Sequence, residues 1–236
     1  MKVVTFGELM IRLQPFNYER FVQANNLEFT FGGGEANVAV SLANYGMDAV
    51  YVTKLPAHAI GQAAINSLRR YGVDTSKIVR GGDRVGIYFN EKGASQRGSV
   101  CIYDRAHSAI QEASTADFDW DSIFEGVDWF HFTGITPALG PNVVDICREA
   151  CKAAKAHGVK LWTREEARAA MTDLCQYVDV CISNEEDAKD VFGIEAEATD
   201  IYAGEINREG YKSVAKQLAD KFGFEKVAIT LRESHS

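Results

Sequence analysis

The sequence has no apolar run long enough to cross a membrane and no segment that resembles a secretory leader. Its first apolar run, Val3–Phe6, is far shorter than the roughly 18 residues that a membrane-spanning helix needs. No small-residue cleavage site follows this run. We therefore expect a cytoplasmic protein that makes no contact with a membrane.

Paired cysteines are also missing. The five cysteines are an odd number, and they are scattered without a Cys-x-x-Cys pair. Cys147 and Cys151 lie four residues apart in a predicted helix, but no His or Cys motif accompanies them. This pattern argues against a disulfide framework and against a zinc site. We expect all five to be reduced thiols in or near the core.

Positive charge is in deficit, since 25 Lys and Arg residues face 33 Asp and Glu residues and leave a net charge of −8. This balance argues against nonspecific binding of nucleic acid. An anionic substrate would therefore need a local cluster of Arg or Lys.

A chain of 236 residues is long enough for one large domain, or for one domain with a small appendage.

Two common phosphate-binding motifs are absent, although glycines are concentrated in one place. The stretch Phe29–Val40 reads Phe-Thr-Phe-Gly-Gly-Gly-Glu-Ala-Asn-Val-Ala-Val, which predicts a strand, three glycines and a helix over residues 35–45. Asn37 stands where Gly-x-Gly-x-x-Gly needs its last glycine, and no Gly-Lys-Ser/Thr follows. The glycines could let a ligand approach the backbone, serve as a hinge, or form a simple turn.

Strand and helix patterns alternate through most of the chain, which predicts an α/β fold with a parallel sheet covered by helices on both sides. Strands are predicted at Val3–Phe6, Val50–Thr53, Val127–Phe132, Val178–Ile182 and Lys226–Leu231. Helices are predicted at Ile60–Tyr71, Asn142–His157, from Asn184 or Glu185 to Phe192, and at Glu209–Phe222.

Residues 75–104 depart from this alternation. The short runs Lys77–Arg80, Val85–Asn90 and Ser99–Tyr103 are separated by glycine-rich turns and predict an antiparallel β-ribbon. We expect residues 9–31 to join this ribbon and form a small β-lid. The remainder of residues 1–236 would then form one α/β domain.

Two places look incomplete for such a domain. Between Gly158 and Thr163, which we expect to cap the next helix, only four residues remain for a strand and a loop. We therefore expect a central strand to be missing there. The sequence also ends at Ser236, just after a predicted strand, although ligands of doubly wound sheets bind beyond the carboxyl ends of strands. We expect the chain to be truncated at its C-terminus.

Four segments resemble the ribokinase-like (PfkB) carbohydrate kinases, and among these the 2-keto-3-deoxygluconate kinases. They are Phe6–Leu13, Phe31–Ala39, Gly86–Tyr88 with Ile102–Arg105, and Ser183–Ala188. The resemblance covers essentially the whole chain and implies a three-layer sandwich with a β-lid. It also implies a kinase that uses ATP and Mg²⁺ to phosphorylate a small sugar acid, 2-keto-3-deoxygluconate, at its terminal hydroxyl.

The glycine segment now has an expected role. By match to the family, Gly33, Gly34 and Asn37 contact sugar hydroxyls, and the glycine pair acts as a hinge for the lid. Bare backbone allows the close approach, and the Asn amide offers both a donor and an acceptor. Asn37 could instead be a buried residue that ties the helix to the strand. Glu8, just past the first strand, could also lie near the sugar.

Aromatic and cationic side chains on the ribbon carry the expectation of a sugar acid. Tyr103 and Arg105 share one face of a strand, as Gly86 and Tyr88 do. Together Tyr88, Tyr103 and Arg105 can stack on a sugar, donate hydroxyl groups and bind a carboxylate in a planar, bidentate manner. The alternative is a solvated ribbon face with ordinary aromatic residues.

Asn184 and Asp187 match the family's Asn-x-x-Glu position, which organises Mg²⁺ and the nucleotide phosphates through water. This sequence has Asp where Glu is commoner, and a helix cap would explain the same residues. The family's catalytic aspartate, in a Gly-Ala-Gly-Asp segment, has no counterpart, because Tyr202–Glu205 resembles it only superficially. We expect that base beyond Ser236. The family's Asp-x-Asn-x-Arg strand end is missing near residue 160 as well.

Other functions stay open at this point. The chain could be a fructokinase-like or other sugar kinase, or a non-catalytic relative that binds a sugar acid. An NAD-dependent oxidoreductase would share the α/β pattern but not the glycine spacing. We expect a homo-oligomer that assembles through the lid, because exposed sheet edges need to be covered.

Overall fold

The computed structural model describes residues 1–163, 174–183, 188, 194 and 208–229. The chain forms two compact units, Met1–Asp119 and Trp120–Ser236.

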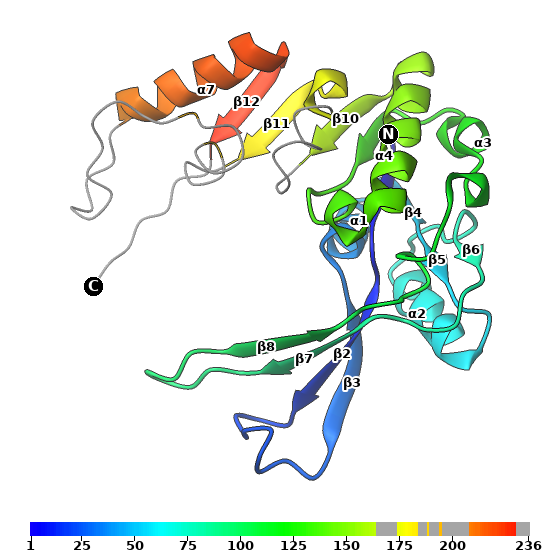
Figure 1. Cartoon of the computed structure of the whole chain (residues 1–236), viewed down its shortest axis with the longest axis vertical. Coiled ribbons are helices and arrows are strands. Elements are labelled where there is room, and N and C mark those ends of the chain that lie inside the picture. Colours follow the sequence, from blue (N-terminus) through cyan, green and yellow to red (C-terminus); the bar gives the residue numbers. More distant parts are fainter. Residues whose placement is uncertain (164–173, 184–187, 189–193, 195–207, 230–236) are drawn as a thin grey trace. The chain divides into compact units, whose positions relative to one another are not determined.

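The body of the first unit combines two parallel strands with two helices (Figure 1). Strand β1 (Lys2–Phe6) pairs in parallel with β4 (Asp48–Val52). Helix α1 (Gly34–Asn44) leads into β4, and α2 (Ala59–Arg69) follows it. Parallel neighbours need a long crossover connection, and here that crossover contains two further strands as well as α1.

These two strands belong to a separate four-stranded sheet with the order β3-β2-β7-β8, which we call the lid sheet. Its strands are β2 (Met10–Pro15), β3 (Leu27–Gly32), β7 (Ile87–Glu91) and β8 (Val100–Asp104). The outer pairs are antiparallel, and β2 pairs with β7 in parallel. In Figure 1 the blue pair β2 and β3 extends downward and the green pair β7 and β8 extends to the left.

The expectation that Lys77–Arg80 belongs to the ribbon is wrong. Val79–Arg80 forms β6, which pairs in parallel with β5 (Lys54–Leu55) in a two-stranded sheet of its own. The reason lies in the path after α2, where the chain turns at Gly72, with φ of +81°, and runs back beside β4. The Asp74 amide donates to the Ala49 carbonyl at 2.8 Å, and this contact aligns the returning chain with the body.

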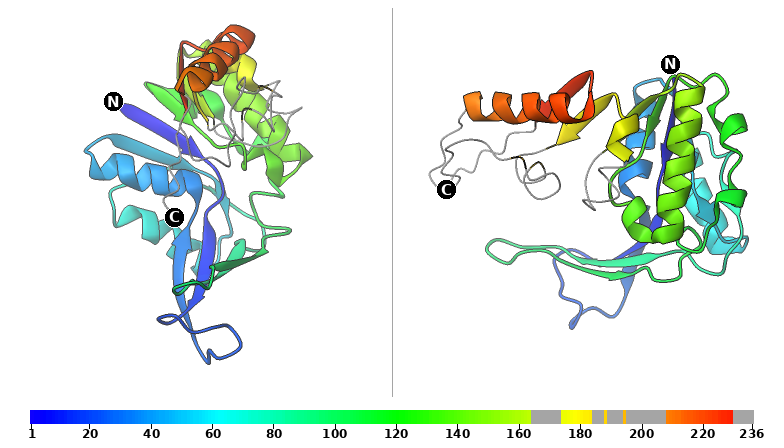
Figure 2. Two further views of the ribbon diagram at one scale, coloured as in Figure 1. Left: turned by 90° about the vertical axis from the view of Figure 1, so that its left-hand side faces the viewer. Right: turned by 45° about the horizontal axis from the view of Figure 1, so that its top comes forward.

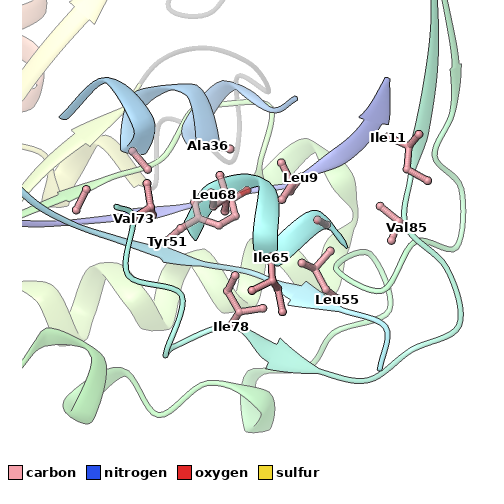
Figure 3. Packing of buried hydrophobic residues seen from close by; sticks show 13 residues of the cluster. Leu9, Ile11, Ala36, Tyr51, Leu55, Ile65, Leu68, Val73, Ile78 and Val85 are labelled. Atoms are coloured by element: carbon pink, nitrogen blue, oxygen red, sulfur yellow. The ribbon is translucent and has the colours of Figure 1, made fainter. Parts of the chain in front are cut away.

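One hydrophobic core holds the body and the base of the lid sheet together (Figure 3). Tyr51, Leu55, Ile65 and Leu68 come from β4, β5 and α2, and Ile11 of β2 joins the same buried cluster. Burying one such side chain contributes about 1.5–3 kcal/mol. The lid sheet is therefore anchored at its base rather than attached through a flexible linker.

The second unit contains four parallel strands in the order β12-β11-β10-β9. They are β9 (Trp129–His131), β10 (Lys160–Thr163), β11 (Val180–Ser183) and β12 (Lys226–Ile229). Its described helices are α3 (Trp120–Phe124), α4 (Pro141–Ala156) and α7 (Arg208–Phe222). Figure 2 shows α7 alongside β12, with which it is in contact.

Helix α4 shows how the sequence pattern determines packing. Pro141 is its first residue, where the missing amide proton costs nothing, and apolar residues recur every three or four positions. The buried residues are Val143, Ile146, Cys147, Ala150, Cys151 and Ala154. All five cysteines are free thiols and four are buried, as expected, but Cys101 is exposed on β8.

The expectation that a central strand is missing near residue 160 is wrong. Strand β10 pairs with neighbours on both sides, since Lys160 stands opposite Trp129 and Trp162 opposite Val180. Four residues suffice for this strand, because the chain turns at Gly158 directly after α4 and enters β10 at once. The helices predicted after Thr163 and from Asn184 or Glu185 lie outside the described residues.

Candidate functional site

The three glycines at the junction of β3 and α1 permit two close contacts. A Cβ atom on Gly32 would lie 2.7 Å from the Tyr88 hydroxyl oxygen, and one on Gly33 would lie 2.2 Å from the Glu8 carbonyl oxygen. Gly34 is the first residue of α1 and is exposed. The predicted order of strand, glycines and helix is confirmed. The glycines do more than form a turn, because they let the lid sheet and the end of β1 approach this backbone.

A partly buried ion pair connects the end of β1 with the end of β8. The Arg105 guanidinium donates to Glu8 Oε2 through Nε at 2.8 Å and again through Nη2. The Ser108 hydroxyl donates to Glu8 Oε1 at 2.6 Å. The Glu8 side chain is 3% exposed and that of Arg105 is 22% exposed. Both oxygens of this carboxylate are therefore satisfied inside the protein, and the charge of Arg105 is largely compensated by Glu8.

Two tyrosines lie side by side on the lid sheet. Tyr88 of β7 is directly opposite Tyr103 of β8, with ring centroids 6.1 Å apart. The Arg105 guanidinium lies over the Tyr103 ring, 5.5 Å from its centroid. Burial raises the pKa of Tyr88 above its usual value, and the nearby charge of Arg12 acts in the opposite direction. Tyr88 therefore keeps its proton at neutral pH and can donate a hydrogen bond.

A cleft of about 520 Å³ opens where β2 and β3 meet α1 and the end of α2, and its volume is in the range that small-molecule sites occupy. Its lining residues are Leu9, Arg12, Thr30, Phe31, Gly32, Ala36, Asn37, Val40, Ser41, Asn44, Ser67, Leu68, Arg70 and Tyr71. Asn37 was predicted from the sequence and lines the cleft. Tyr88 approaches it at Gly32, whereas Tyr103 and Arg105 do not line it.

Three further charged residues of this region were not predicted, and one of them, Arg70, lines the cleft near the end of α2. Arg12 lines the cleft, and the signal for it was a lone cation inside the otherwise apolar run Met10–Leu13. Glu35, in the first turn of α1, is 4% exposed, and a Cβ atom on Gly7 would lie 2.2 Å from its Oε2. No pattern in the sequence distinguishes Glu35 from an ordinary acidic residue in the first turn of a helix.

The predicted nucleotide site cannot be placed on this structure. Asn184 and Asp187 lie outside the described residues. Within the ranges that the structure describes, no three His, Cys, Asp or Glu side chains gather as a metal site would require. In the same ranges no helix is both long and apolar enough to span a membrane.

The comparison with known families identifies the class of protein. The family model for pfkB family carbohydrate kinases matches residues 1–231. The chain therefore belongs to this family, which confirms the resemblance drawn from its four segments and the predicted α/β fold. Membership implies a phosphotransferase that acts on a small sugar substrate, with ATP as the phosphoryl donor.

Individual relatives within the family carry names that specify a substrate. One solved relative is 2-dehydro-3-deoxygluconokinase from Thermotoga maritima, whose sequence is 48% identical to this chain. Its crystal structure superposes with a TM-score of 0.93, and the match covers 99% of this chain and 72% of that one. The 2-dehydro-3-deoxygalactonokinase of Haloferax volcanii is 34% identical over 244 residues, or 98% of this chain and 72% of the relative. The 2-dehydro-3-deoxygluconokinase of Bacillus subtilis is 29% identical over 147 residues, which are 61% of this chain and 45% of the relative.

Proposed function

We propose that the protein is an ATP-dependent kinase of 2-keto-3-deoxy sugar acids, with 2-keto-3-deoxygluconate as its substrate and the terminal hydroxyl as the phosphorylated group. The relatives named above support a sugar acid rather than a neutral sugar. The observation that carries the proposal is the grouping of Tyr88, Tyr103 and Arg105 at one end of the lid sheet, close to the glycine segment.

In this proposal the sugar lies between the lid sheet and the start of α1. Gly33 and Gly34 offer backbone, and the Asn37 amide hydrogen-bonds the sugar hydroxyls. Tyr88 and Tyr103 provide ring surfaces and phenolic hydroxyls. Sugar hydroxyls and ring C–H groups suit such a mixed surface, because each tyrosine is apolar on its face and polar at its tip.

Arg105 would contact the carboxylate of the substrate while Glu8 holds its guanidinium in place. The two hydrogen bonds to Glu8 use Nε and Nη2, and an Arg side chain carries five N–H donors. Donors on the other terminal nitrogen can therefore serve a ligand. A hydrogen bond to a charged group is worth about 1.5–3 kcal/mol.

Mg²⁺ belongs to the same proposal as the ion that accompanies ATP. Asn184 and Asp187 remain the candidate residues, acting through water. Mg²⁺ usually keeps several water ligands beside substrate phosphates and one or two carboxylates, and this chemistry fits an Asn and an Asp. The ion would neutralise charge on the phosphates during transfer.

We also propose a homodimer that forms through the apolar face of the lid sheet. Phe29, Leu13, Phe89 and Ile102 lie in register across its four strands and therefore share one face. Phe29 is 49% exposed and Ile102 is 52% exposed. A second copy of the chain would cover this row with its own.

Free thiols in the core are consistent with a reducing compartment, so we place the enzyme in the cytoplasm.

Product analysis tests the proposed reaction. The full-length protein would be incubated with ATP, Mg²⁺ and 2-keto-3-deoxygluconate, and the product examined by phosphorus and carbon NMR. We expect one phosphomonoester, coupled to the terminal carbon of the sugar acid. A phosphate at another position, or ATP consumption that does not depend on the sugar acid, would contradict the proposal.

A further inference from the structure

Ser108 is a buried polar residue that the proposed function leaves without a role. It is 1% exposed and lies three residues after Arg105, in the segment that leaves the lid sheet. Its hydroxyl donates to Glu8 Oε1 at 2.6 Å, whereas both hydrogen bonds from Arg105 go to Glu8 Oε2. The two residues therefore bind different oxygens of one carboxylate. Together they fix the rotation of that carboxylate about its terminal bond.

A tight turn brings Arg105 and Ser108 to the same carboxylate. The Ser108 amide donates to the Arg105 carbonyl at 3.3 Å, which closes a turn of four residues. His107, the third residue of this turn, has a φ of +58°, in the left-handed region that is unfavourable for a residue with a Cβ atom. Such a conformation persists where the surrounding structure enforces it. Here the contacts of both ends of the turn with Glu8 provide that enforcement.

Gly86 closes the remaining side of this network. It directly precedes β7, and its carbonyl accepts a hydrogen bond from the Ile11 amide at 2.8 Å. A Cβ atom on Gly86 would lie 2.5 Å from Glu8 Oε1 and 3.3 Å from the Arg105 Cβ. The Gly86 backbone is therefore packed against the same carboxylate oxygen that Ser108 binds. No side chain fits at this position without displacing Glu8.

The network determines which part of Arg105 is available to a ligand. Glu8 occupies Nε and Nη2, and Nη1 forms no hydrogen bond with the residues that the structure describes. Because the guanidinium is planar and rigid, two nitrogens held on one oxygen set the direction of the Nη1 hydrogens. The Tyr103 ring, 5.5 Å from Arg105 Cζ, covers one face of the same group.

The hydrogen bond from Ser108 keeps the Glu8–Arg105 contact on a single oxygen. Without it, Glu8 Oε1 would lose its hydrogen bond, and the carboxylate could rotate to offer both oxygens to Arg105. Arginine and carboxylate groups favour such a bidentate arrangement, so the guanidinium would shift to adopt it. Its Nη1 donors would then point in a different direction, and Glu8 would compete more strongly with any carboxylate on the ligand.

We propose that Ser108 is a positioning residue for the carboxylate of the sugar acid, because it acts through Glu8 to keep the Nη1 donors of Arg105 directed at the ligand. This inference rests on the proposed function, in which Arg105 contacts that carboxylate. It adds a residue that does not itself touch the substrate. Its effect should be confined to ligands that carry the carboxylate charge, since the Nη1 donors serve that group.

Binding of a charged and an uncharged form of one ligand measures this effect without turnover. Dissociation constants for 2-keto-3-deoxygluconate and for its methyl ester would be determined by calorimetry on the full-length protein, without ATP. The wild type should bind the acid at least about ten-fold more tightly than the ester. Ser108→Ala should lower this preference by about three- to ten-fold, which corresponds to the net value of one hydrogen bond, and should change ester binding much less.

Two further variants show whether Ser108 acts through Glu8 and Arg105. Gly86→Ala leaves every hydrogen-bonding side chain in place but puts a methyl group against Glu8 Oε1, so it should lower the preference for the acid as well. Ser108→Ala combined with Arg105→Ala should lower the preference no further than Arg105→Ala alone, because the residue that Ser108 positions is gone.

Other serine variants serve as controls. Ser108→Thr keeps the hydroxyl and should retain most of the preference for the acid. Ser108→Cys, with a much weaker donor of similar size, replaces Ser108→Ala if that variant does not fold. The Ser114 hydroxyl donates to Asp117 at 3.2 Å, so Ser114→Ala also loses a hydrogen bond between a serine and a carboxylate. It should keep the wild-type preference.

The outcomes separate this inference from the proposed function. Ser108→Ala and Gly86→Ala overturn the inference if they weaken acid and ester binding equally, or if both keep the wild-type preference. A further fall in preference when Ser108→Ala is added to Arg105→Ala overturns it too. In these cases the wild type still prefers the acid, and the proposed function stands. If the wild type has no such preference, or if Arg105→Ala retains it, the proposed carboxylate contact fails and the inference fails with it.

Discussion

Removing Arg105 should destabilise the protein mainly through the carboxylate that it leaves behind. The Glu8 side chain is 3% exposed; its carboxylate accepts two hydrogen bonds from Arg105 and one from Ser108. Removing one partner of a buried ion pair costs about 3–5 kcal/mol. Because Arg105 is 22% exposed, water can partly replace it. We therefore expect Arg105→Ala to lower the free energy of unfolding by about 3 kcal/mol, at the low end of that range.

A double-mutant cycle shows whether this loss comes from the unpaired charge. Glu8→Gln removes the charge but keeps an acceptor for the Ser108 hydroxyl. The double variant Glu8→Gln/Arg105→Ala should therefore be more stable than Arg105→Ala alone, with a coupling energy of about 1–3 kcal/mol. Urea unfolding followed by circular dichroism measures all four proteins. Losses that add within about 0.5 kcal/mol would show that Glu8 and Arg105 do not act as a pair.

Three other predictions address the glycines, the lid and the metal. Gly33→Ala should destabilise the protein by about 1–3 kcal/mol, because the new Cβ would lie 2.2 Å from the Glu8 carbonyl oxygen. Gly98→Ala is the control, since no atom lies within 4 Å of a Cβ at that position. An unchanged thermal midpoint for Gly33→Ala would contradict the close contact. Light scattering at micromolar concentration should show a dimer that Ile102→Arg disrupts. Val22→Arg is the control and should leave the dimer intact, because Val22 is already 90% exposed. A wild-type monomer would refute assembly through the lid. Asp187→Asn should raise the Mg²⁺ concentration needed for half-maximal turnover and leave sugar affinity nearly unchanged, and an unaltered Mg²⁺ dependence would favour the helix-cap interpretation.

Elements determined by local periodicity were predictable from the sequence. The buried face of α4 follows from its apolar spacing, and the runs Val85–Asn90 and Ser99–Tyr103 predicted the antiparallel pair that the structure shows as β7 and β8. Residues 160–163 were misjudged because the length of the segment was compared with an average strand and loop. The strand begins almost at once, since the turn at Gly158 connects α4 directly to β10.

Contacts between distant segments were not predictable in the same way. Glu8 and Arg105 are 97 residues apart, so no local pattern links them. The same holds for Arg12, whose position beside Tyr88 depends on the parallel pairing of β2 with β7. The sequence could show which residue types are present near a glycine segment. It could not show that Arg105 already has a counter-ion in Glu8.

The specificity constant for an acid and a neutral sugar tests the central claim most directly. The value of kcat/KM would be measured for 2-keto-3-deoxygluconate and for fructose with the wild-type, full-length protein at fixed ATP and Mg²⁺. A site that holds a carboxylate through a charge-assisted hydrogen bond should favour the acid by about ten- to a hundred-fold or more. Equal values for the two substrates, or a preference for fructose, would contradict the assignment of this chain as a sugar-acid kinase.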